Sequence, residues 1–130
     1  MTHPNEQRFR DGYAAFQRRD VEALRNDYFT EDVVWHSPGR NPLSGDFRGI
    51  DEVMGAFGRL AQETGGNFSL EIHDCIADDE HAVVIGTVRG ERNGKKLEDR
   101  YTHVVHMQDG KVAESWLLQE DLYAVDEFFS

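Results

Sequence analysis

The clearest pattern along the chain is an apolar stripe of helical period that begins at Ile50. Acidic residues at 51 and 52 suit the positive end of a helix dipole, and Gly65-Gly66 lie where glycine often ends a helix. The spacing predicts an amphipathic helix over residues 50–60. The stripe consists of Ile50, Val53, Met54, Phe57, Leu60 and Ala61.

Two weaker helical patterns precede this stripe. Phe9, Tyr13 and Phe16 share one face of a predicted first helix. A second pattern at residues 21, 24 and 28 follows Asp20, whose carboxylate suits a helix N-cap. Three helices are therefore expected before residue 65.

From residue 67 onward the pattern changes to strands. Phe68, Leu70 and Ile72 alternate with polar side chains, as in a strand with one buried face. Helices first and strands later favour an α+β fold with a mainly antiparallel sheet. A chain of 130 residues holds one core, so a single domain over residues 1–130 is expected.

Two turn signals set the expected strand register. Asn-Gly at residues 93–94 predicts a two-residue hairpin loop, which sets Gly86 opposite Tyr101. A glycine opposite a tyrosine predicts open space above the sheet, so Tyr101 and His103 are expected to face a cavity. The same register pairs opposite charges, Arg89 with Glu98 and Glu91 with Lys96.

Asp-Gly at residues 109–110 predicts a further hairpin, for which two registers are possible. A two-residue loop sets Trp116 opposite His103, whereas a three-residue loop with a glycine bulge puts Ser115 and Leu117 on that face. We expect the first register. The other face is then too apolar to be left wet, which predicts a homodimer through the sheet. Its apolar residues are Val83, Ile85, Val104 and Leu117.

Trp35 and His36 end a short β-branched strand, and Pro38 and Gly39 begin an irregular loop. Side chains at such a strand end can face a cavity, where a neutral imidazole accepts a proton near physiological pH. His36 is therefore the candidate base. The alternative is a histidine that bonds nearby backbone and helps to close the loop.

The strand, loop and helix over residues 33–60 resemble those of the SnoaL-like and ketosteroid-isomerase-like families, within the NTF2-like superfamily. The resemblance runs from about Phe9 to the last strand and implies an NTF2-like (cystatin-like) cone, with three N-terminal helices packed on a curved sheet. In this comparison His36 replaces the catalytic aspartate of the isomerases, His103 lies near their oxyanion acid, and Tyr13 lies within one residue of their oxyanion tyrosine.

Both acids of the isomerases are thus replaced by histidine, so steroid isomerisation is not implied. Simple alternatives are a buried His103 bonded to a tyrosine and a Tyr13 that only packs in the core. Some polyketide-cyclase-like relatives use an acidic residue after the last strand, but we expect Glu120 and Asp121 to be solvated. The residues expected to contact substrate are Trp35, Phe57, Tyr101 and Trp116.

The charge balance excludes two classes of partner. With 14 Lys and Arg against 25 Asp and Glu, a net charge of -11 repels nucleic acids and anionic membranes. The chain shows no signal peptide or membrane-spanning stretch, and Cys75 is its one cysteine, so a cytoplasmic protein is expected. His103 and His106 are three apart in a strand and point to opposite faces, and no metal or cofactor motif appears, so neither is expected.

We therefore expect a small cofactor-free enzyme that binds a small apolar organic molecule in the cone. Proton transfer next to a carbonyl, in an isomerisation, cyclisation or dehydration, is the chemistry that His36, His103 and Tyr13 could support. The alternative is a non-catalytic module of the same fold that binds a small ligand or a protein partner, because this fold hosts both classes.

Overall fold

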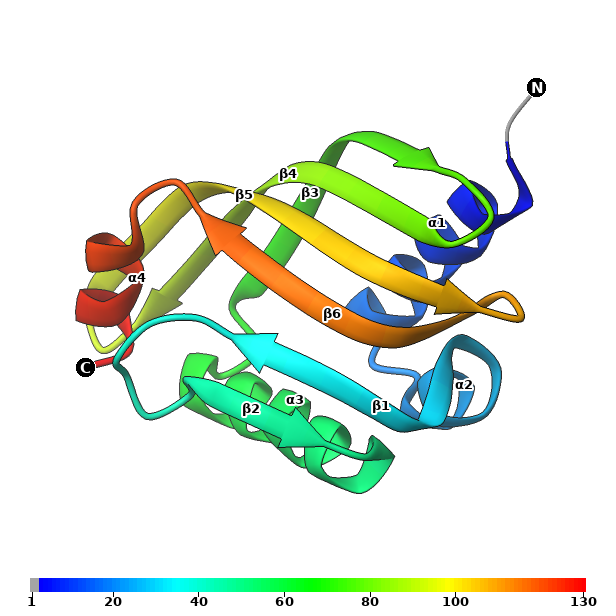
Figure 1. Ribbon diagram of the computed structural model, residues 1–130. Helices are drawn as coiled ribbons and strands as arrows, with labels where there is room; N and C mark the ends of the chain where they lie inside the picture. Colours follow the sequence, from blue (N-terminus) through cyan, green and yellow to red (C-terminus); the bar gives the residue numbers. More distant parts are fainter. Residues whose placement is uncertain (1–2) are drawn as a thin grey trace.

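The structure is a computed structural model, which describes residues 3–130. Six strands form one sheet in the order β2-β1-β6-β5-β4-β3, and β1 and β6 run parallel while the other neighbours are antiparallel (Figure 1). The predicted α+β class and mainly antiparallel sheet are confirmed. The elements are α1 (Pro4–Gln17), α2 (Val21–Ala23), η1 (Leu24–Tyr28), β1 (Phe29–Ser37), β2 (Gly45–Arg48), α3 (Ile50–Thr64), β3 (Phe68–Ala77), β4 (His81–Arg92), β5 (Lys95–Gln108), β6 (Lys111–Gln119) and α4 (Leu122–Phe128).

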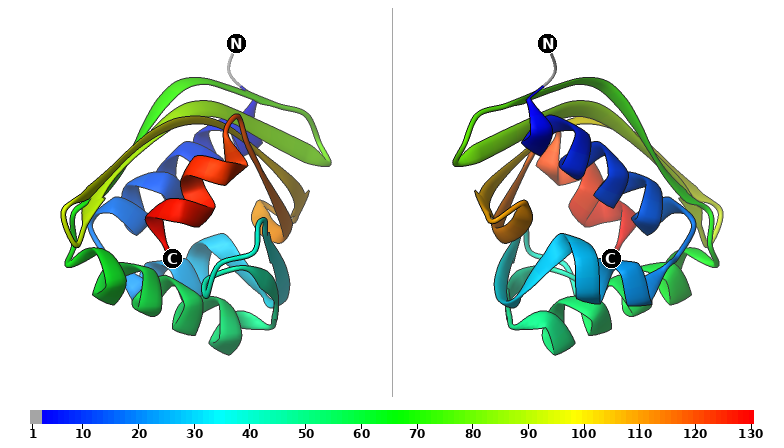
Figure 2. Two further views of the ribbon diagram at one scale, coloured as in Figure 1. Left: turned by 90° about the vertical axis from the view of Figure 1, so that its left-hand side faces the viewer. Right: turned by 90° about the vertical axis from the view of Figure 1, so that its right-hand side faces the viewer.

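The sheet is curved, and α1, α3 and α4 lie on its concave side (Figure 2). α3 packs against β1 and β2, and α1 packs against β3. This arrangement is the predicted cone, with the short C-terminal helix α4 as an element that the sequence did not reveal. No helix within residues 3–130 has the length and apolarity needed to cross a lipid bilayer.

The predicted helices differ in how closely the structure follows them. α3 buries Ile50, Val53 and Met54 and ends at Gly65, whose left-handed φ of 59° favours glycine. Asp20 caps the second helix by accepting the Ala23 N–H at 3.1 Å. That helix is one turn long, however, and continues as the wide π-helical turn η1.

The register of β4 and β5 is confirmed, but the space expected above Gly86 is filled. Gly86 lies opposite Tyr101 and Arg89 lies opposite Glu98. A Cβ at position 86 would lie 2.5 Å from the Glu71 carbonyl oxygen and 3.0 Å from the Tyr101 hydroxyl. The glycine therefore admits the tyrosine ring itself, rather than leaving an opening for a ligand.

The expected register of β5 and β6 is wrong, although the turn type is right. Asp109 and Gly110 both have positive φ, as in a type I′ loop. An irregularity follows on β6, because Met107 pairs with Val112 while His106 pairs with Glu114. The extra residue in β6 is a β-bulge, and it shifts every later residue of β6 to the other face. In consequence Leu117, not Trp116, lies opposite His103.

A pair of glycine substitutions tests this packing. Gly86→Ala should lower the free energy of unfolding by about 1 to 3 kcal/mol, because the new methyl group meets backbone and the Tyr101 ring. Gly55→Ala is the control, since its Cβ meets nothing within 4 Å in α3 and removing a helical glycine should add up to about 1 kcal/mol. Denaturant unfolding measures both, and an unchanged stability of Gly86→Ala would contradict the close approach.

Candidate functional site

A cavity of about 150 Å³ lies between the helices and the concave face of the sheet. Many of its lining residues are aromatic, and the rings of Trp35 on β1 and Phe57 on α3 meet edge to face with centroids 4.8 Å apart. Such edge contacts fix the rings and keep the lining apolar. The other phenylalanines of the lining are Phe9, Phe16, Phe29, Phe47, Phe68 and Phe129.

A chain of hydrogen bonds crosses one side of this cavity. The Tyr101 hydroxyl donates to the Tyr13 hydroxyl at 3.1 Å, and the Tyr13 hydroxyl lies 2.8 Å from Nδ1 of His103. Nε2 of His103 lies 2.5 Å from Oγ of Ser115. If Tyr101 donates to Tyr13, then Tyr13 donates to Nδ1 and the neutral imidazole donates from Nε2 to Ser115.

Burial keeps the side chains of this hydrogen-bond network uncharged. His103 is 3% exposed, and desolvation lowers its pKa to about 3. Desolvation also raises the pKa of Tyr13 well above its ordinary value and the pKa of Tyr101 to about 12. At neutral pH these hydrogen-bonded side chains are therefore all neutral, and His103 is a weak base.

The structure thus brings five of the seven expected site residues to one cavity. Tyr13 comes from α1, where it follows Phe9 on the same helix face, and Tyr101 and His103 alternate along the concave face of β5. Trp35 and Phe57 line the same cavity, and the Trp35 ring contacts the His103 ring with centroids 5.0 Å apart.

His36 does not lie in this cavity, so its expected position is wrong. Successive side chains of a strand point to opposite faces, and Trp35 takes the inner face of β1. The His36 ring lies outside, with Nδ1 2.7 Å from Oδ1 of Asp46 and Nε2 2.6 Å from Oε2 of Glu114. Hydrogen bonds to these two carboxylates raise the pKa of His36. The imidazole is therefore an ion-pair partner that links β1, β2 and β6.

Trp116 also lies outside, which corrects its assignment as a substrate contact. Its ring stacks on His36 with centroids 5.6 Å apart. The β6 bulge is the cause, and it places Ser115 behind His103 and Leu117 in the cavity wall. The alternative register considered from the sequence identifies both of these residues.

Gln119 is a lining residue that sequence reasoning missed. It lies at the end of β6 opposite Tyr101. Its Oε1 is buried and has no hydrogen-bond partner in the structure. A glutamine at the end of a predicted strand carries no signal by itself, and the shifted register is needed to place it on the inner face.

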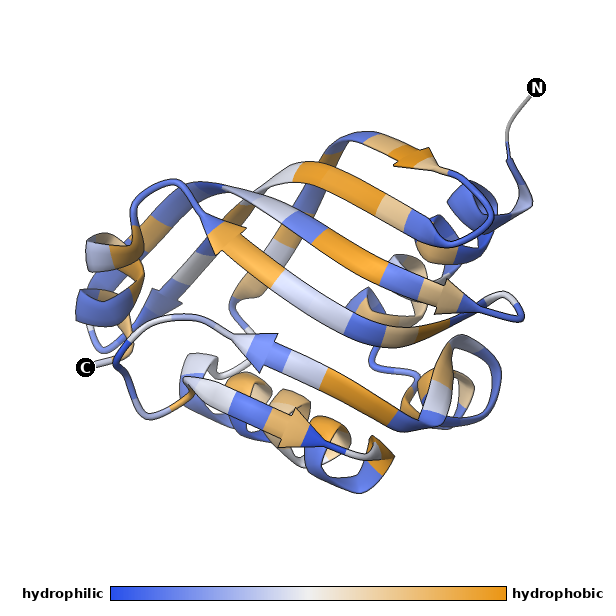
Figure 3. Ribbon diagram, in the orientation of Figure 1, coloured by the Kyte–Doolittle hydropathy of each residue, from blue (hydrophilic) through white to orange (hydrophobic). Residues whose placement is uncertain are grey.

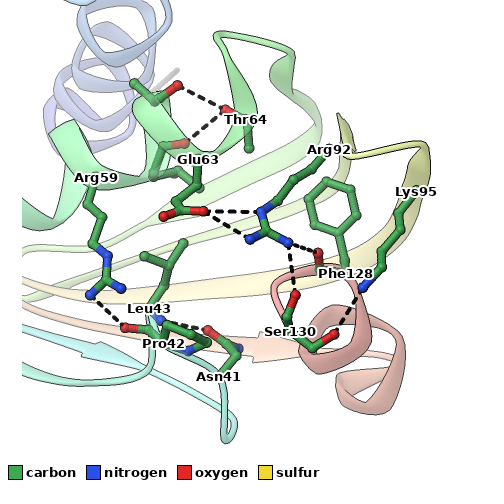
Figure 4. Close-up of polar contacts among 12 residues, drawn as sticks. Asn41, Pro42, Leu43, Arg59, Glu63, Thr64, Arg92, Lys95, Phe128 and Ser130 are labelled. Atoms are coloured by element: carbon green, nitrogen blue, oxygen red, sulfur yellow. Dashed lines mark hydrogen bonds and ion pairs between the residues drawn. The ribbon is translucent and has the colours of Figure 1, made fainter.

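The helix α4 covers one end of the cavity and is held there by basic side chains (Figure 4). Arg92 donates to the carbonyl oxygens of Phe128 at 3.1 Å and Ser130 at 3.0 Å, and it pairs with Glu63. Asp121 caps the first turn of α4 by accepting the Ala124 N–H. Asp121 thus has a structural role, and neither it nor Glu120 lines the cavity.

Among residues 3–130, no group of three His, Cys, Asp or Glu side chains is placed to hold a metal ion. The cavity lining contains no carboxylate or thiol among these residues. Its titratable groups are Arg8, Tyr13, Tyr28, Tyr101 and His103.

Comparisons with known proteins agree with this geometry. The family described as SnoaL-like domain matches residues 9–115. The uncharacterized protein Rv0034 of Mycobacterium tuberculosis is 29% identical over 119 residues, which cover 91% of this chain and 90% of that protein. Bal32a, from a soil-derived mobile gene cassette, has 34% identity and a TM-score of 0.93, with 98% and 97% of the two chains covered. TerC, co-crystallized with polyporic acid, shares the fold at 24% identity, a TM-score of 0.85 and 98% coverage of each chain.

The outward His36 cluster predicts a pH dependence of stability. Since the folded-state pKa is raised, the protonated imidazole stabilises the fold below its unfolded pKa of about 6.5, and this contribution is lost as the pH rises through the folded pKa. The difference in unfolding free energy between wild type and His36→Gln should therefore be largest near pH 6 and shrink at alkaline pH. Glu114→Gln removes the carboxylate that raises the His36 pKa most, and it should weaken this dependence. A difference that grows with pH would contradict the ion-pair role.

Proposed function

The chain belongs to the family of SnoaL-like domains, and from this premise we propose that its cone binds one small, mostly apolar, ring-containing molecule. The observation that carries the proposal is the aromatic-lined cavity with the hydrogen-bonded Tyr101, Tyr13 and His103 along one side. A dry cavity of about this size accommodates benzene in other proteins. The expected ligand is therefore a compact ring system rather than an extended chain.

Acid–base catalysis on that ligand is a second candidate function, favoured by the buried tyrosine pair. No carboxylate lines the cavity within the described residues, and the pKa of about 3 makes His103 a weak base at neutral pH. If Ser115 instead donates to Nε2 of His103, Nδ1–H donates to Tyr13 and Tyr13 donates to Tyr101, the Tyr101 hydroxyl is left to donate to a ligand carbonyl. With solvent water taking the α proton, stabilising the developing enolate in this way suits isomerisation, cyclisation or dehydration.

We also propose a homodimer through the outer face of the sheet. Val83, Val104 and Trp116 are neighbours across β4, β5 and β6, and Ile85 and Leu118 flank Thr102 in the next row. Ile85 is 43% exposed and Leu118 is 58% exposed, and Figure 3 shows apolar segments of these strands side by side. Leu117, which the sequence assigned to this face, lies inside; Trp116 and Leu118 take its place.

Ligand binding can be tested by filling the cavity. Leu117→Trp places a large ring in the cavity wall and should weaken binding of p-xylene at least about tenfold, measured by NMR titration or calorimetry. Leu118→Trp is the matched control, because the next residue on β6 points outward and should leave binding unchanged. Binding of p-xylene to Leu117→Trp as tightly as to wild type would place the ligand elsewhere.

Catalysis can be tested through hydrogen exchange of a cyclic ketone. If the tyrosine pair stabilises an enolate, the protein should accelerate deuterium uptake next to the carbonyl of cyclohexenone, and Tyr13→Phe should reduce this rate roughly 10²-fold. Tyr28→Phe is the control, because Tyr28 lines the cavity but is not hydrogen-bonded to Tyr13, Tyr101 or His103. No acceleration by wild type over buffer would leave the binding module as the function.

The dimer has a charge signature. Each copy carries a net charge of -11, so two copies repel, and association should strengthen as salt screens that repulsion. Sedimentation at micromolar concentration should show a dimer, with Leu118→Glu a monomer and Tyr123→Glu, 90% exposed on α4, unchanged. A monomeric wild type at high salt would contradict this interface.

A further inference from the structure

One polar atom of the cavity lining has no explanation within the protein. Oε1 of Gln119 is buried and accepts no hydrogen bond, although Gln119 itself lines the cavity. Burying an amide oxygen without a partner is costly, and native proteins satisfy the great majority of such atoms. The surroundings of Gln119 therefore indicate what kind of ligand group would donate a hydrogen bond to this oxygen.

The neighbours of Gln119 cannot supply the missing proton as they stand. Tyr101 lies directly across from it in the sheet, and its hydroxyl donates to Tyr13. Tyr13 and His103 in turn use their protons along the same chain toward Ser115. With these donors engaged, none of the three side chains donates to Gln119 Oε1.

Positive charge is equally unavailable to a ligand. Arg8 is the one lysine or arginine among the described lining residues. Its guanidinium donates to the carbonyl oxygens of Gly110 and Asp27 and lies over the Tyr28 ring, 4.7 Å from the centroid. A carboxylate or phosphate would therefore enter an apolar cavity without a free cation, at a high desolvation cost.

We propose that Gln119 is a specificity residue, and that the ligand of the cone is a neutral ring compound whose hydroxyl or ring N–H group donates to Gln119 Oε1. This inference rests on the proposed function, because it requires that the cavity binds a ligand. The donor sits near the end of β6, beside the start of α4 (Figure 1), and the apolar part of the ring lies against the aromatic wall.

Matched probes test the donor. p-Cresol and p-xylene differ only by hydroxyl against methyl, and indole and indene differ by N–H against CH₂. For each pair, calorimetry gives the dissociation constant of the probe without a donor divided by that of the probe with one. In Gln119→Leu and Gln119→Met this ratio should be roughly 5- to 150-fold lower than in wild type for the pair whose donor bonds to Gln119, because that donor loses its acceptor. Gln108→Leu, at an exposed position of β5, should leave the ratio unchanged.

The melting temperature of the ligand-free variants is a second measurement, and it should fall only if Gln119 Oε1 has a structural role. Removing an unsatisfied buried oxygen should leave the melting temperature of Gln119→Leu and Gln119→Met equal to or above that of wild type. A marked drop in both would show that the oxygen has a partner in the protein and would overturn the inference.

Failure of this inference differs from failure of the proposed function. If wild type binds the probes but both ratios stay unchanged in the Gln119 variants, the cavity is a ligand site and Gln119 does not select for a donor. If wild type binds none of the four probes at millimolar concentration, the proposed function is wrong, and the inference falls with it.

Discussion

A buried imidazole needs a partner on each of its two nitrogens, and in this fold the partners of His103 come from opposite directions. Tyr13 reaches Nδ1 from α1, and Ser115 reaches Nε2 from β6. An unpaired nitrogen there would cost about 1 to 3 kcal/mol. One residue of β5 therefore constrains both the rotation of α1 over the sheet and the register of β6.

The β6 bulge belongs to the same constraint. Without the extra residue, Trp116 would lie opposite His103, and an indole offers a donor but no acceptor on its nitrogen. With it, Ser115 lies behind the imidazole, and Trp116 stacks on His36 at the outer face. The shift also determines the faces of the last residues of β6: Leu117 and Gln119 point into the cavity, and Leu118 points outward.

The parts of this arrangement that could be predicted are those set by local pattern. The α3 stripe, the Asn93-Gly94 hairpin and the helix-then-strand order depend on periodicity and turn chemistry, which a single sequence displays. The positions of Tyr101 and His103 followed because their register depends on that hairpin alone. The position of His36 could have been corrected by the same rule, since Trp35 and His36 are adjacent in a strand and cannot both face inward.

What could not be predicted depends on partners distant in sequence. Nothing near Ala113 marks a bulge, because the bulge satisfies a histidine ten residues earlier on the neighbouring strand. The carboxylates around His36 come from residues 46 and 114, which meet only when β2 and β6 flank β1. Gln119 needs both the bulge and the fold of α4 before its burial is visible.

The concave face carries features that work against stability, and this bears on function. A cavity of about 150 Å³ costs roughly 3 to 4 kcal/mol if it stays unfilled, by the scale measured for engineered cavities. The unpaired Gln119 oxygen adds to that cost, and Arg92 and Glu63 hold α4 across one end of the space rather than letting the end collapse. A larger side chain at position 117 would relieve the first cost, and an apolar one at position 119 would relieve the second. Their persistence is physically reasonable if a ligand supplies the missing contacts and the missing proton donor when it binds.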